Sequence, residues 1–343
     1  MNKNVARMAV LVFATGFSGA VAQEQPDTLQ HYVFFGRDRE RINEPGFLDS
    51  PAFAGAQLKY TWKELEPEKD TYDTDLIVRD LEVLQAKGKK LFIHLQDISF
   101  STQIVNVPDY LQADPAYNGG AHIQYEVEDD QDKVVTPIGW VARRWDPAVL
   151  DRFSKLLHAL GEKLDGKIEG INFAETSVGF GHTGEYFPEG FTFKAYRDGI
   201  KAMMRAGRDA FPNSTVIVYA NFMPGEWIPW NDHGYLKSIY AYAQEIGVGV
   251  GGPDLLPHRK GQLNNSYPLI RARARSVPGG VAVQWGNYDQ LVPDTGLKIS
   301  VPEIHRFGRD YLRLDYIFWC TQEPSYSKDV IPYLNRVSVR RQL

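Results

Sequence analysis

The sequence predicts a single (β/α)8 barrel, and two observations lead to this fold. Eight short runs rich in Val, Ile, Phe and Tyr alternate with segments of helical periodicity, which is typical of βα units built on a parallel sheet. No glycine-rich G-x-G-x-x-G turn follows the first run, which disfavours an open sheet that binds a dinucleotide. We expect the strands at residues 31–36, 56–60, 90–95, 170–174, 215–220, 247–251, 280–284 and 314–319.

Ahead of the first strand, residues 1–22 have the pattern of a secretory signal peptide. Lys3 and Arg7 precede an apolar run over residues 8–22, and the small residues that end this run suit a signal peptidase, with Gln23 as the mature start. The run is interrupted by Thr15 and is shorter than the ~20 apolar residues that cross a bilayer. We therefore expect a secreted or periplasmic protein, with no membrane anchor after cleavage, whose barrel domain spans residues 23–343.

Helices are expected between the strands. The segment 146–164 opens on Asp146, a favoured capping residue, followed by Pro147, and then carries leucines at helical spacing. The other expected helices span residues 75–87, 193–210, 234–245 and 301–312.

One long connection interrupts the alternation. Residues 97–145 follow the third strand as an irregular insertion that carries an acidic run at 126–132. Loops of this length in a compact domain are often functional, although a solvated surface excursion explains the acidic run equally well.

Composition narrows the classes of partner. Formal net charge is −5, and Lys and Arg are dispersed, so the basic stripe that binds nucleic acid is missing from the sequence. Cys320 is the only cysteine, which excludes an internal disulfide. The motifs for a metal-dependent or serine hydrolase, H-E-x-x-H and G-x-S-x-G, do not occur either. We expect no metal and no cofactor.

The end of the second strand carries the most specific motif. Trp62, Leu65, Glu66 and Pro67 form W-x-x-L-E-P, and Tyr72-Asp73 follow before the next helix. This junction resembles the superfamily of (β/α)8 glycoside hydrolases that includes β-galactosidases, xylanases and cellulases. The resemblance implies a barrel that acts on carbohydrate, in which Glu66 marks the fold and is not a catalyst.

At the end of the fourth strand, the resemblance places the general acid/base at Glu175. An apolar surround can raise the pKa of such a carboxyl group, and Phe173, Ala174 and Val178 are suitable neighbours. The superfamily has Asn directly before this Glu, whereas Phe173 and Ala174 separate Asn172 from Glu175. A Glu that caps a segment or pairs with an Arg remains the alternative.

The second carboxylate of a hydrolase is not at its usual place. The superfamily takes a nucleophilic Glu from the end of the seventh strand, where this chain has Gln284, and an amide cannot form the glycosyl ester. In order of preference, Asp254 after the sixth strand, Glu323 after the eighth and Asp289 beyond the seventh are the candidate partners of Glu175.

Many strand ends carry side chains suited to sugars, whose rings stack on indole and whose hydroxyls pair with amides. The expected carbohydrate-binding residues are Trp62, His94, Gln96, Asn172, Tyr219, Asn221, Gln284, Trp285 and Trp319. Two further tryptophans in the loop after the fifth strand, Trp227 and Trp230, either extend this surface or cover the loop.

These observations favour an exported glycoside hydrolase that uses Glu175 with Asp254 or Glu323. A barrel that binds carbohydrate without cleaving it, as Gln284 suggests, and a polysaccharide lyase remain open alternatives.

Overall fold

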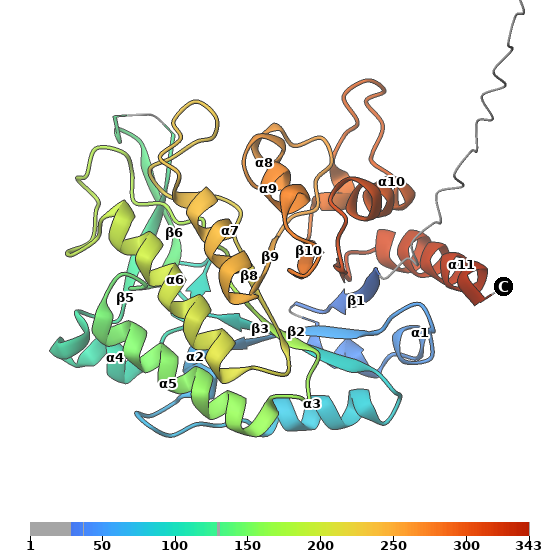
Figure 1. The fold of residues 1–343 in the computed structure, drawn as a ribbon, viewed down its shortest axis with the longest axis horizontal. Helices are drawn as coiled ribbons and strands as arrows, with labels where there is room; N and C mark the ends of the chain where they lie inside the picture. Colours follow the sequence, from blue (N-terminus) through green and yellow to red (C-terminus); the bar gives the residue numbers. More distant parts are fainter. Residues whose placement is uncertain (1–28, 37, 129–130, 343) are drawn as a thin grey trace, which may run out of the picture.

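The computed structural model describes residues 29–36, 38–128 and 131–342. The expected signal peptide, residues 1–22, lies outside this part of the chain. Eight parallel strands close into a barrel in the order β1-β11-β10-β9-β8-β7-β3-β2 (Figure 1). The strands are β1 Gln30–Phe34, β2 Gly55–Thr61, β3 Lys90–Gln96, β7 Gly170–Phe173, β8 Thr215–Tyr219, β9 Gly249–Gly252, β10 Gly279–Val283 and β11 Tyr316–Cys320. The predicted (β/α)8 barrel is confirmed.

The strand ends agree with the sequence prediction to within two residues. The start of β9 is two residues later than expected, because Gly247 adopts φ 72° and ends the preceding helix. This left-handed conformation favours glycine.

Long helices cover the outside of the barrel, and α5 shows why they form where they do. The Asp146 carboxylate accepts hydrogen bonds from the backbone N–H groups of Ala148 (2.8 Å) and Val149 (3.3 Å), and Pro147 occupies the first turn. The α-helices are α1 Pro45–Leu48, α2 Trp62–Leu65, α3 Asp75–Gln85, α4 Asp109–Ala113, α5 Pro147–Leu164, α6 Phe193–Ala210, α7 Tyr235–Ile246, α8 Lys260–Asn264, α9 Ser266–Ala272, α10 Val301–Arg306 and α11 Ile331–Gln342.

Shorter helical turns connect these elements. They are η1 Arg39–Asn43, η2 Pro115–Tyr117, η3 Asn287–Asp289, η4 Phe307–Tyr311 and η5 Tyr326–Val330. The helix expected over 301–312 is therefore split, because a π-helical turn, η4, continues α10.

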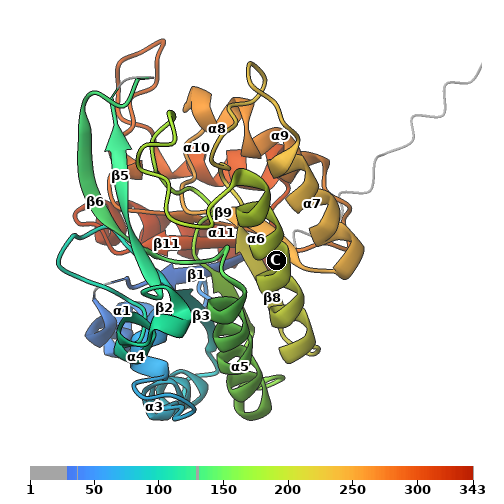
Figure 2. The ribbon, with the colours of Figure 1, turned by 90° about the vertical axis from the view of Figure 1, so that its left-hand side faces the viewer.

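The insertion after β3 is not irregular, and that expectation was wrong. It contains a three-stranded antiparallel sheet in the order β4-β6-β5, formed by β4 Ile98–Ser99, β5 Ala121–Val127 and β6 Val135–Ala142. The β5–β6 hairpin stands beside the barrel in Figure 2. The Tyr125 N–H donates to the Gly179 carbonyl over 2.8 Å, which ties β5 to the segment after β7.

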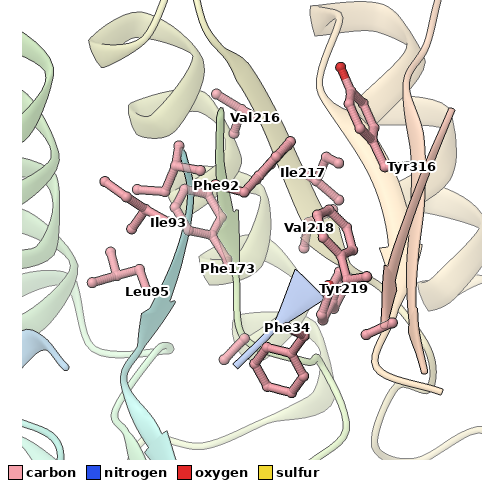
Figure 3. Close-up of a cluster of buried hydrophobic side chains, with 14 of the residues drawn as sticks. Phe34, Phe92, Ile93, Leu95, Phe173, Val216, Ile217, Val218, Tyr219 and Tyr316 are labelled. Carbon is pink, nitrogen blue, oxygen red and sulfur yellow. The ribbon is translucent and has the colours of Figure 1, made fainter. Parts of the chain in front are cut away.

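The barrel interior changes character along its axis. Near the amino ends of the strands it is filled by aromatic rings from Tyr32, Phe92, Tyr316 and Phe318, whose centroids lie 5.1–6.2 Å apart. Figure 3 shows part of this buried cluster. Toward the carboxyl ends the inward residues become polar, so the chemistry of the chain gathers at that mouth.

Candidate active site

A buried polar layer closes the barrel beneath its mouth. The Gln57 amide on β2 donates hydrogen bonds to Asn172 Oδ1 (2.8 Å) and to Tyr219 Oη (2.9 Å), which joins β2, β7 and β8. Asn172 and Tyr219 are fully buried, so the direct sugar contacts expected of them are wrong. They form the floor on which the site is built.

Two inward residues of β3 lie at the edge of this floor. Gln96 Nε2 is 2.5 Å from His94 Nε2, and both side chains are almost completely buried. Burial, followed by the nearby charge of Lys59 on β2, holds the pKa of His94 well below its usual range. His94 is therefore neutral at physiological pH, and contact of His94 or Gln96 with a sugar stays a prediction.

Glu175 lies above the floor, two residues beyond the end of β7, with a partly exposed side chain. Burial is the largest influence on its carboxyl group, and it raises the pKa of Glu175 to about 7. The hydrogen bond from Asn221 and the charges of Arg144 and Lys59 lower this pKa, whereas the charge of Asp254 raises it. A carboxyl group with a pKa raised in this way can exchange a proton near neutral pH, which is the property of a general acid/base.

Asn221 fixes the orientation of the Glu175 carboxylate. Its Nδ2 donates to Glu175 Oε2 over 2.7 Å, while its Oδ1 accepts from the backbone N–H groups of Ser177 (3.2 Å) and Phe222 (2.9 Å). The two accepted bonds leave only one orientation of the amide. The sequence prediction placed Asn221 at the site, and here it contacts the acid itself.

The backbone of Glu175 is held by a buried ion pair. Arg144 donates two hydrogen bonds to the Asp97 carboxylate (2.6 and 2.7 Å), and a third to the Glu175 carbonyl (2.7 Å). The same guanidinium donates to Tyr196 Oη (3.0 Å), whose hydroxyl donates to the Thr176 carbonyl (3.0 Å). The guanidinium of Arg144 thus positions both Glu175 and Thr176 at the turn after β7.

The backbone of Arg144 is closely packed. A Cβ atom on Gly199 of α6 would lie only 1.7 Å from the Arg144 carbonyl oxygen. The helix therefore packs directly against the Arg144 backbone because position 199 has no side chain.

Sequence reasoning missed Arg144 and Asp97. Asp97 directly follows β3, so the strand-end rule could have identified it. Arg144 comes from the end of the insertion, and nothing in the sequence signals its contact with Glu175.

Asp254 follows β9, and its charge acts on Glu175. Burial raises the pKa of Asp254, and the hydrogen bond from Asn287 Nδ2 (3.0 Å) and the charge of Arg259 partly oppose that effect. The Asp254 charge also raises the pKa of Glu175. The preferred pairing of Glu175 with Asp254 stays a prediction.

Asn287 holds Asp254 as Asn221 holds Glu175. Its Oδ1 accepts from the backbone N–H groups of Gln284 (2.9 Å) and Leu255 (3.2 Å), and its Nδ2 faces the acid. Gln284 itself is half-buried at the end of β10, where the superfamily nucleophile was expected. The sequence prediction missed Asn287.

The other two candidate carboxylates, Glu323 and Asp289, are bonded to other side chains. Glu323 accepts from Arg41 (3.1 Å) and from Ser327 Oγ (2.6 Å), so its expected role as alternative partner of Glu175 is not supported. Asp289 accepts from Lys298 (2.5 Å) and Gln322 (2.8 Å) on the exposed surface. Both acids stabilise loops around the mouth.

For two of the three tryptophans, the prediction that the indole ring stacks on a sugar is wrong. Trp62 and Trp319 are each 0% exposed and lie in the core, where their indole N–H groups donate to Glu66 (2.8 Å) and His31 (3.2 Å). Trp285, which follows β10, is 56% exposed and remains free to stack on a sugar.

Within residues 29–36, 38–128 and 131–342, no cluster of three or more His, Cys, Asp or Glu side chains could hold a metal ion. None of the helices in this part of the chain is both long and apolar enough to cross a membrane.

Comparison with solved structures returns the same barrel. The catalytic domain of β-amylase from Paenibacillus polymyxa aligns with a TM-score of 0.55 at 8% identity, over 86% of this chain and 92% of that domain. A GH5_18 protein from Streptomyces cattleya, solved in complex with Manβ1-4GlcNAc, aligns with a TM-score of 0.50 at 13% identity, over 84% of this chain and 70% of its own. At such low identity these likenesses establish the fold.

No family model and no curated protein sequence matches the chain.

Proposed function

We propose that this protein is a glycoside hydrolase with Glu175 as general acid/base and Asp254 as the second carboxylate. One observation carries the proposal. At the barrel mouth, burial and, to a smaller extent, the charge of Asp254 raise the pKa of Glu175 to about 7. Hydrolysis of a glycosidic bond needs two carboxyl groups, one to protonate the leaving oxygen and one to stay ionised.

The roles follow from the protonation states. Protonated Glu175 donates its proton to the departing glycosidic oxygen and is then ionised. If Asp254 attacks the sugar carbon, ionised Glu175 takes the proton of the water that hydrolyses the glycosyl ester and is protonated again; if Asp254 instead takes the proton of the attacking water, Glu175 acts as acid only. The fixed amides of Asn221 and Asn287 keep both carboxylates in place throughout. The proposed reaction requires no cofactor.

The likeness to solved hydrolases supports the proposal at the level of the barrel. Both aligned proteins carry names or ligands of carbohydrate chemistry, and the mouth of the barrel is where such folds bind their substrates. We also propose, from residues 1–22 alone, that the enzyme acts outside the cytoplasm.

The test compares Glu175→Gln and Asp254→Asn with Glu323→Gln as the matched control. Release of aryl leaving groups from a panel of nitrophenyl glycosides, and of reducing ends from polysaccharides, should fall about 10²- to 10⁴-fold in the first two variants. Glu323→Gln should stay within about twofold of wild type, because its carboxylate is bonded to Arg41 and Ser327. Undiminished turnover by Glu175→Gln would refute the assignment.

A second function is favoured by Gln284. A barrel without a carboxylate at the end of β10 could bind carbohydrate without cleaving it. Calorimetry that detects glycan binding by wild type in the absence of any turnover would favour this reading over hydrolysis.

A further inference from the structure

A groove lies beside the β5–β6 hairpin, close in the sequence to Glu175. Residues 177–179, which follow Glu175 and Thr176, line it together with Tyr125 and Glu126 of β5. Two hollows of about 790 and 690 Å³ share these lining residues and therefore adjoin each other. Each hollow is of the size that a whole drug-sized ligand fills, so the groove is longer than a single sugar requires.

The β5–β6 hairpin forms one side of this groove. The Tyr125 N–H bonds the Gly179 carbonyl over 2.8 Å, and a Cβ atom on Gly179 would lie 2.0 Å from the Tyr125 carbonyl oxygen. Because the two backbones are in contact, the hairpin packs directly against the segment that follows Glu175.

Trp227 forms a flat platform along the groove. One face of its indole stacks on Phe222, with ring centroids 5.3 Å apart and planes within 2° of parallel. Its backbone exchanges two hydrogen bonds with Asn231 (2.8 and 2.9 Å), yet 47% of the residue is exposed. Since Phe222 covers one face, the other face is open, and a ring already held in place loses little entropy when a ligand stacks on it.

The platform and the acid are fixed by the same side chain. Asn221 Oδ1 accepts from the N–H groups of Phe222 and Ser177, which both line the groove, while Asn221 Nδ2 donates to Glu175. Chemistry at Glu175 and binding along the groove therefore share one rigid support.

We propose that this groove binds an extended polysaccharide chain and that Trp227 stacks on a sugar remote from the cleaved bond. Hydroxyl and amide side chains line the groove beside its aromatic faces, which matches sugar rings that have polar edges and apolar C–H faces. The lining residues of this polar kind include Ser101, Thr102, Gln103, Gln124 and Gln262. The substrate class, a polymer and not a small glycoside, rests on the proposed hydrolase function.

The experiment uses two tryptophans of one loop. Trp230 is 73% exposed and is not among the residues that line the groove, so Trp230→Ala is a matched control for Trp227→Ala. Binding to xylan, galactomannan, mixed-linkage β-glucan, polygalacturonate and starch is measured by affinity electrophoresis in the Glu175→Gln background. Turnover of the bound polysaccharide and of nitrophenyl glycosides is measured in the active background.

Trp227→Ala should weaken polysaccharide binding about tenfold and lower the ratio of polysaccharide to aryl glycoside turnover by a similar factor. Trp230→Ala should match its parent in both. Equal binding by the two variants, or binding of no polysaccharide in the set, overturns the proposal that the groove binds a polysaccharide. Binding that depends on Trp227 without cleavage by wild type supports the role of the groove and rejects the hydrolase function. Cleavage that does not depend on Trp227 supports the hydrolase function and rejects the role of the groove.

Discussion

At the scale of single residues, the proposed site consists of two acids with one asparagine each. Asn221 and Asn287 use the carbonyl oxygen of the side chain to accept two backbone N–H groups and the amide nitrogen to contact an acid. Their hydrogen bonds lower the pKa of Glu175 and Asp254, whereas burial raises both. The protonation of Glu175 therefore depends on opposing contributions that substitutions can remove one at a time.

Two substitutions should shift the pKa of Glu175 in opposite directions. Asp254→Asn removes a negative charge that raises this pKa, so the pKa falls; Asn221→Ala removes a hydrogen bond that lowers it, so the pKa rises. Carbon-detected NMR titration of the Glu175 carboxyl group, assigned by its loss in Glu175→Gln, measures both. Asn221→Ala should also slow turnover on the order of tenfold, because the acid loses a charge-assisted hydrogen bond.

Asp289→Asn is the control for this pair of variants. Its carboxylate is bonded to Lys298 and Gln322, so the pKa of Glu175 should not change. Shifts of the same sign in Asp254→Asn and Asn221→Ala would contradict the opposing effects of Asp254 and Asn221 on Glu175.

At the scale of elements, the strands were predictable because β-branched and aromatic runs repeat with clear breaks. The side on which a residue lies was harder to predict. Tyr316 and Phe318 face into the barrel, so the alternation along β11 turns Trp319 outward, and Trp62 starts α2 instead of ending β2. A difference of one residue in position therefore explains why both tryptophans were wrongly expected to contact a sugar.

The site was predictable only as far as the strand-end rule extends. This rule found Glu175 and Asp254, because both lie within two residues of a strand. Arg144 and Asn287 escaped it, since each acts through a contact between segments that are distant in the sequence. Neither residue type carries a local signal for such a contact.

The Arg144–Asp97 pair joins the end of β3 to the turn after β7, and a double substitution can separate its structural and catalytic parts. Arg144→Met leaves Asp97 buried without its cation and should destabilise the protein by about 3–5 kcal/mol. Arg144→Met combined with Asp97→Leu removes both charges and should recover much of this loss in urea unfolding. Turnover should stay low in the double variant, because the Glu175 carbonyl has lost its donor. Full recovery of turnover would show that the pair does not position the acid.

At the scale of the whole molecule, the raised pKa of Glu175 is a property of the closed barrel. Its largest cause is burial, and burial exists only when the strands and the insertion surround the mouth. In the unfolded chain the carboxyl group returns to its ordinary pKa of 4.5. Folding therefore favours the protonated form of Glu175 and disfavours the ionised form.

This linkage predicts that Glu175 reduces the stability of the fold as pH rises. Between pH 4.5 and about 7 the folded state binds more protons than the unfolded state, so the free energy of unfolding falls over this window and levels off above it. Glu175→Gln has no such penalty and should be more stable than wild type by about 1–3 kcal/mol well above neutral pH, with no difference at about pH 4. Urea unfolding at a series of pH values measures the difference.

Glu323→Gln should respond with the opposite sign. Partial burial raises the pKa of Glu323, but the hydrogen bonds from Ser327 and Arg41 lower it overall, so its ionised form favours the folded state. The stability that Glu323 contributes is present above its ordinary pKa of 4.5 and is lost as pH falls below it. Removing this carboxylate should therefore weaken the protein at neutral pH and make no difference in strong acid. If Glu175→Gln also weakened the protein at high pH, Glu175 would be an ordinary stabilising ion and could not serve as the acid of the site.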